Sequence, residues 1–154
     1  MGRFGCIFGA LLVVAGDERP AAERQIASIQ GQWIASDVWS GGHQLRQREV
    51  QKSQVGFEFH GERFTLTERN QEIEAGPFTI DGDAAPFVLT VGITVNRGKA
   101  CPGRTPEKYL FELDGDKMTI AWIDLDGLTG RELPKKIDTK SDVQRVYVMT
   151  RIAK

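Results

Sequence analysis

The chain has 154 residues, of which 40% are hydrophobic and 27% are charged, a composition typical of a soluble globular domain and not of a disordered chain. Its 20 basic and 21 acidic residues give a formal net charge of -1 and form no long run of either sign. Neither nucleic acid nor an acidic membrane surface is therefore expected as a partner.

The N-terminus differs in character from the rest of the chain. An apolar run of twelve residues, Phe4–Ala15, ends abruptly at Asp17. It is too short for a comfortable membrane span, which takes about 20 residues, but it matches the apolar part of a secretory signal. We expect residues 1–15 to be a signal peptide and the mature protein to be exported to the periplasm or cell exterior, without stable membrane insertion. An uncleaved anchor or a buried first strand is the alternative.

Residues 19–30 predict a short helix that opens the mature domain, which we expect to span residues 19–154. Pro20 suits the first turn of this helix, and Gly31 ends it. Three apolar residues recur at helical spacing and predict one buried face: Ala22, Ile26 and Ile29.

Alternating apolar and polar residues then predict a series of strands with short turns between them. Residues 87–95 alternate most strictly and predict the longest strand, whereas Gly76-Pro77 interrupts its strand and predicts a bulge or an unpaired edge position. Residues 39–54 predict a long loop over one end of the sheet, and residues 96–106 predict a second loop. The strands before this second loop are expected at residues 32–38, 55–60, 64–67, 73–80 and 87–95.

The clearest local pattern is the segment 107–124, in which two alternating runs flank Asp114-Gly115-Asp116. Asp-Gly favours a tight hairpin turn because these residues tolerate positive φ. A final strand is expected at residues 143–152. The resulting eight strands, with no helix between them, predict an all-β fold: an eight-stranded antiparallel up-and-down barrel with a short N-terminal helix.

Two motifs carry a resemblance to a known family. Ile29-Gln30-Gly31-Gln32-Trp33 and the hairpin from Tyr109 to Ile120 resemble the corresponding segments of small exported lipocalin-like domains, a family abundant in planctomycete bacteria. The likeness runs from about Ile26 to Arg151. It departs in one loop, where Arg131-Glu132-Leu133-Pro134 stands in place of the family's Arg-Pro pair. The resemblance implies a lipocalin-like barrel more strongly than it implies any activity.

Closure of the barrel brings the first and last strands of the sheet side by side. If the first and last strands pair antiparallel, the start of the first lies beside the end of the last. Trp33, just after Gly31, and Arg151 occupy those two places. We expect Trp33 to plug this end of the barrel, with the Arg151 guanidinium lying over the indole or bonding to nearby carbonyls. A solvated Arg151 on a frayed C-terminus is the alternative.

The sequence offers little support for catalysis or metal binding. His43 and His60 lie on different segments, and we expect no metal site and no cofactor. Cys6 would leave with the signal, so Cys101 is the only thiol of the mature chain and no intrachain disulfide can form. Nearby basic residues favour a thiolate at Cys101, but no adjacent histidine or second cysteine supports a thiol enzyme. Two interpretations of Cys101 therefore remain, a surface thiol and an inert loop cysteine. For the protein as a whole, we expect no enzymatic activity.

Apolar residues on the predicted strands supply candidates for the barrel interior. A filled core and a ligand-lined cavity are both compatible with them, since small eight-stranded barrels have narrow interiors. We expect a barrel that binds a small apolar or amphipathic ligand; the alternative is a solid protein-interaction or structural module at the cell surface. The candidate interior residues are Trp33, Phe57, Phe59, Phe64, Leu89, Val91, Tyr109, Phe111, Trp122 and Tyr147.

Overall fold

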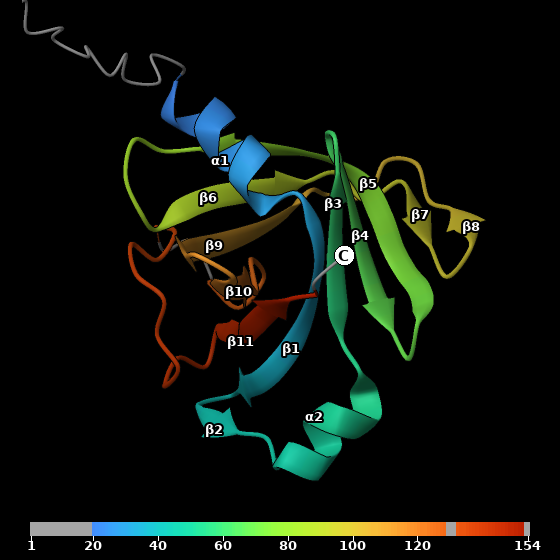
Figure 1. Ribbon diagram of the computed structural model, residues 1–154, viewed down its shortest axis with the longest axis vertical. Helices are drawn as coiled ribbons and strands as arrows, with labels where there is room; N and C mark the ends of the chain where they lie inside the picture. Colours follow the sequence, from blue (N-terminus) through green and yellow to red (C-terminus); the bar gives the residue numbers. More distant parts are fainter. Residues whose placement is uncertain (1–19, 129–131, 153–154) are drawn as a thin grey trace, which may run out of the picture.

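A computed structural model describes residues 20–128 and 132–152 of the chain, and the predicted signal peptide lies outside them. Eight antiparallel strands form a closed barrel in which strands that follow one another along the chain lie side by side, and the first pairs with the last. Figure 1 shows β6, β9, β10 and β11 on one side, β3, β4 and β5 on the other, and β1 between them. The barrel strands are β1 (Gly31–Ser40), β3 (Gly56–His60), β4 (Arg63–Glu68), β5 (Gln71–Asp81), β6 (Phe87–Val91), β9 (Glu107–Asp114), β10 (Lys117–Ile123) and β11 (Gln144–Arg151). The predicted eight-stranded up-and-down barrel is thus confirmed.

Five short elements accompany the barrel. The predicted N-terminal helix is present as α1 (Ala21–Ile29), with Ile29 buried. The others are β2 (His43–Gln44), α2 (Gln47–Ser53), β7 (Val95–Asn96) and β8 (Lys99–Ala100). In the described ranges neither helix has the length and hydropathy that a membrane crossing requires.

The prediction of a loop over residues 39–54 is wrong, because this segment contains β2 and α2. Gly41 and Gly42 both take positive φ and turn the chain back so that β2 pairs with the end of β1. At the start of α2 the Glu49 carboxylate accepts a hydrogen bond from the Arg46 backbone N–H at 3.0 Å. Only Val50 of this helix is buried, so its apolar face is a single residue wide and produces no visible helical pattern.

The strand predicted at residues 87–95 ends at Val91, and the longest strand is β5, with eleven residues. Beyond Val91 the chain still follows β5, since the Gly92 N–H donates to the Pro77 carbonyl and the Thr94 N–H to the Ala75 carbonyl, both at 2.9 Å. Irregular backbone at residues 92–94 separates β6 from β7. Alternation of side chains does not report such a break, because the residues on either side keep their apolar character.

The bulge expected at Gly76-Pro77 also lies elsewhere, but the alternative of an unpaired position holds on one side of β5. Both residues pair with β4, whereas pairing with β6 begins at Phe78 and pairing with β7 ends at Ala75. The register between β4 and β5 shifts by one residue at Ile73, because Leu66 pairs with Glu74 and the next residue of β4 pairs with Glu72. Gly76 has a different role, as its α-carbon faces the Gly92 carbonyl at a distance that leaves no room for a side chain. The loop predicted at residues 96–106 likewise contains the turn and second strand of the small β7–β8 hairpin.

At the end of the barrel where α1 joins β1, the contact expected from closure is present. Trp33 pairs with Arg151 across the β1–β11 ladder, and the guanidinium carbon lies 4.2 Å from the centre of the indole. The indole N–H donates to the Ile29 carbonyl at 2.8 Å. The Arg151 guanidinium donates to the carbonyls of Gln30 and Ser28, the latter at 2.6 Å. Gly31, at φ 109°, lies beneath this guanidinium.

Candidate functional site

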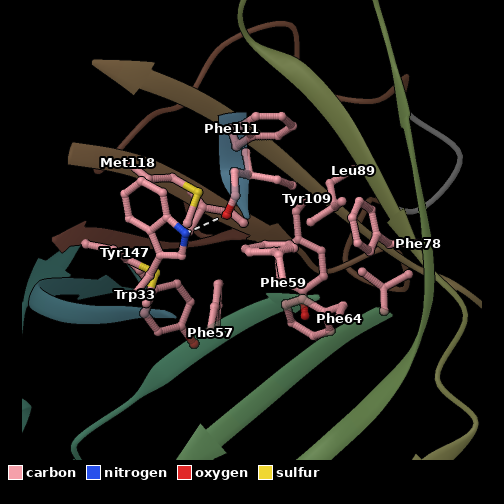
Figure 2. Close-up of a cluster of buried hydrophobic side chains, with 14 of the residues drawn as sticks. Trp33, Phe57, Phe59, Phe64, Phe78, Leu89, Tyr109, Phe111, Met118 and Tyr147 are labelled. Atoms are coloured by element: carbon pink, nitrogen blue, oxygen red, sulfur yellow. Dashed lines mark hydrogen bonds between the residues drawn. The ribbon is translucent and has the colours of Figure 1, made fainter. Parts of the chain in front are cut away.

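The middle of the barrel is filled with side chains. Phe57 and Phe64 pack edge to face with ring centres 5.3 Å apart, and Phe59 packs against Phe78 in the same way at 5.4 Å. Figure 2 shows these rings converging from different strands, with Trp33 hydrogen-bonded at one side of the cluster. Nine of the ten predicted interior residues lie in this packed core, and Trp122 packs against it. The nine are Trp33, Phe57, Phe59, Phe64, Leu89, Val91, Tyr109, Phe111 and Tyr147. They fill the space that a long apolar ligand would need.

A pocket of about 190 Å³ opens at the other end of the barrel. It lies where β9 and β11 begin and β10 ends, and its floor is aromatic. Four of the predicted interior residues, at the edge of the packed core, also line it: Phe57, Tyr109, Trp122 and Tyr147. Its other lining residues were not predicted from the sequence and are Leu66, Glu74, Glu107 and Arg145.

Two carboxylates in this pocket share one guanidinium. Arg104, from the segment between β8 and β9, places one nitrogen 2.5 Å from Glu74 Oε1 and another 2.5 Å from Glu107 Oε1. The side chains of Glu74 and Glu107 are only 12% and 14% exposed, whereas that of Arg104 is 35% exposed. The Tyr109 hydroxyl donates to the second oxygen of Glu107 at 2.9 Å, and the Asn96 amide donates to Glu74 at 3.1 Å.

This environment raises the pKa of Glu107 and of the tyrosines that line the pocket. Burial raises the pKa of Glu107, as does the neighbouring Glu74 carboxylate, while Tyr109, Arg104 and Trp122 oppose the rise. Burial also raises the pKa of Tyr109 well above its ordinary value, with a further contribution from the Glu107 charge. Tyr109 therefore keeps its proton and remains a hydrogen-bond donor to Glu107 at physiological pH.

The raised pKa of Glu107 has a measurable consequence for stability. The folded protein holds a proton at Glu107 more tightly than the unfolded chain, so this residue makes the free energy of unfolding fall as pH rises from the ordinary value of 4.5 through the raised pKa. Glu107→Gln retains an oxygen acceptor for Tyr109 but cannot titrate. Urea unfolding at a series of pH values across this window should show a smaller fall with pH for the variant. An identical pH dependence in both proteins would contradict the assignment.

Arg145 supplies the remaining charge of the pocket, on the wall formed by β11. Its Nε donates to the Ser40 hydroxyl at 3.3 Å. Burial raises the pKa of the Tyr147 hydroxyl, and Arg145 partly opposes that rise. With Glu74, Glu107 and Arg104, the pocket and its rim thus carry two negative and two positive charges.

The other residues singled out in the sequence do not converge on this pocket to form a reactive centre. Cys101 is half-buried, with its sulfur 3.7 Å from the Ile93 carbonyl oxygen. His43 and His60 are both exposed and lie on β2 and β3. Within residues 20–128 and 132–152, no group of three or more histidine, cysteine or acidic side chains is arranged to hold a metal ion.

Fold and site together define a closed antiparallel barrel with a solid middle and a small mixed aromatic and charged pocket at one mouth. Comparisons of the chain with protein-family models, curated protein sequences and solved structures found no match.

Proposed function

We propose that this protein is an exported, non-enzymatic barrel that binds a small amphipathic molecule in the pocket at its mouth. The observation that carries the proposal is the pairing, within one pocket, of aromatic surfaces with the buried charges Glu74 and Glu107. Ligand sites characteristically combine apolar walls with a few placed polar groups. Export rests on the N-terminal apolar run, which lies outside the described residues.

The size of the pocket limits the ligand. A volume of about 190 Å³ lies below the range of about 300 to 1,000 Å³ that accommodates drug-sized ligands. At about 30 Å³ per molecule, it corresponds to about six waters. Because the aromatic core closes the floor, a fatty acid, retinoid or haem could not extend inward. The ligand we propose has a single ring or short chain with one polar head.

Binding can be tested with three compounds that share one ring and differ in charge: benzamidine, benzamide and benzoate. We expect at least one of them to shift the indole N–H resonance of Trp122, which lines the pocket, while that of the core residue Trp33 stays in place. Leu66→Phe should fill the pocket and abolish the shift. The matched control Ile34→Phe, at a position 41% exposed on the outer face, should leave it unchanged.

The filled interior also favours a second function, a structural or protein-interaction module at the cell surface. Native mass spectrometry of protein purified from its own host separates the two functions. A bound small mass that Leu66→Phe loses would support ligand binding. If native mass spectrometry shows no added mass and none of the three compounds shifts the Trp122 indole N–H resonance, the ligand-binding proposal is wrong. The structural or protein-interaction module would then be the remaining function.

A further inference from the structure

Of the charged groups at the pocket, the Arg104 guanidinium is the one that can move away from it. Glu74 and Glu107 belong to the barrel strands β5 and β9, whereas Arg104 lies in an irregular segment between Gly103, at φ 79°, and Pro106. Its head group is also more exposed than either carboxylate that it pairs with. A glycine with positive φ and a short irregular segment allow the side chain to swing out while the two carboxylates stay in place.

The charge of the pocket determines what could take the place of Arg104. The lining itself contains two carboxylates and one cation, Arg145, so its net charge is -1 when Arg104 is withdrawn. Leaving largely buried carboxylates without a partner is costly, because they have already lost most of their hydration. A second cation restores neutrality, whereas an anion would add a further negative charge. The arrangement therefore selects for positive ligands.

The aromatic walls favour the same class of ligand. Trp122, Tyr109, Tyr147 and Phe57 surround the space beside the two carboxylates. The faces of such rings attract ammonium and guanidinium groups, by about 0.5 to 2 kcal/mol depending on their desolvation. A compound with an apolar ring or chain and one cationic head would therefore contact these rings and pair with Glu74 and Glu107 at once.

A neighbouring hollow offers Arg104 a place to go. It measures about 260 Å³, shares Glu107 and Trp122 with the pocket, and is lined by Arg104 together with Asp124 and Asp126. A guanidinium released from the pocket can thus turn toward two other carboxylates instead of losing all electrostatic partners. The exchange of one cation for another at Glu107 then proceeds without exposing an unpaired buried charge.

We infer that the ligand is a small organic cation, a primary amine or guanidinium-type compound, and that Arg104 acts as an internal substitute for it. This inference rests on the proposed function and narrows it to one class of ligand. The internal guanidinium competes with the ligand for the same carboxylates. Only molecules in which Arg104 has left the site can bind the cation, so the apparent affinity of the wild-type protein is lower than the affinity of the vacated site. Removing Arg104 should tighten the binding of cations alone.

Calorimetric titration with benzamidine, benzamide and benzoate tests this inference. We expect the wild type to prefer benzamidine, and Arg104→Gln to bind benzamidine at least about tenfold more tightly, with no comparable gain for the other two compounds. Glu74→Gln, introduced into the Arg104→Gln protein, should reverse this gain. Arg63→Gln is the matched control, because the pair that Arg63 forms with Glu72 at 3.6 Å is exposed to solvent, and this variant should bind as the wild type does.

A measurement on the wild-type protein covers the case in which Arg104→Gln does not fold. Saturating benzamidine should move the Nε–H resonance of Arg104 and leave that of Arg63 in place. If benzamidine binds and the Nε–H resonance of Arg104 does not move, the inference that the ligand takes the place of Arg104 is wrong. Binding of benzamide or benzoate in preference to benzamidine, lost in Leu66→Phe, would overturn the cation inference and keep the proposed function. No binding of any of the three compounds would overturn the cation inference, and together with no added mass in native mass spectrometry it would overturn the proposed function as well.

Discussion

Replacing Trp33 by alanine is expected to lower the free energy of unfolding by about 3 to 5 kcal/mol, the range measured for aromatic truncations in packed cores. Its side chain is 1% exposed, and its indole N–H satisfies the Ile29 carbonyl at the end of α1. Truncation removes both the packing and this hydrogen bond, which leaves a buried carbonyl without a partner. Urea unfolding followed by circular dichroism measures the change. Ile34→Ala, at the next position on the exposed face, should change stability by less than about 0.5 kcal/mol.

Part of this loss belongs to the contact between Trp33 and Arg151. A double-mutant cycle with Trp33→Ala and Arg151→Ala isolates the interaction between the two side chains. We expect a coupling of about 0.5 to 2 kcal/mol, because the guanidinium lies over the indole and its side chain is 27% exposed. Arg151→Lys should recover only part of it, since an ammonium cannot bond to the Gln30 and Ser28 carbonyls in the same forked arrangement. Additive effects of the two alanine substitutions would exclude a direct contribution.

This contact shows what alternation along the chain can predict. Strict two-residue periodicity assigns each strand an inner face, and the number of strands requires closure, so the pairing of the first and last strands follows from topology alone. Trp33 and Arg151 could therefore be placed together without knowledge of any distance. Elements with little buried surface could not be predicted, and α2, with Val50 as its single buried residue, is the example.

The candidate site could be predicted only in part, because periodicity assigns a face to residues on strands but not to residues in irregular segments. Glu107 precedes Tyr109 by two positions and Arg145 precedes Tyr147 by two, so both share the inner face of their strands and could have been recognised as pocket residues. Arg104 lies in an irregular segment, where no periodicity relates its position to the barrel. Whether the interior is filled also depends on how large side chains interdigitate in three dimensions, as Phe57, Phe59 and Phe64 do.

Gly76→Ala is expected to be the most damaging small substitution in the β5 region, with a loss of about 3 kcal/mol, the upper end of the usual cost of overpacking. A β-carbon at this position would lie 1.9 Å from the Gly92 carbonyl oxygen and 3.1 Å from the Thr94 backbone nitrogen. Both are backbone atoms and cannot rotate away, so the irregular segment at residues 92–94 must separate from β5. Such a shift also weakens the hydrogen bonds that the Gly92 and Thr94 N–H groups donate to β5.

Gly92→Ala provides the matched control, because its β-carbon would meet only Pro77 atoms at 3.7 and 3.8 Å, which are ordinary contact distances. Urea unfolding should therefore show a large loss for Gly76→Ala and a change below about 1 kcal/mol for Gly92→Ala, although both exchanges add one methyl group. Hydrogen exchange adds a local readout, since the Thr94 amide should lose protection in Gly76→Ala and retain it in Gly92→Ala. Equal stability losses in the two variants would mean that the close approach of the two segments does not constrain residue 76.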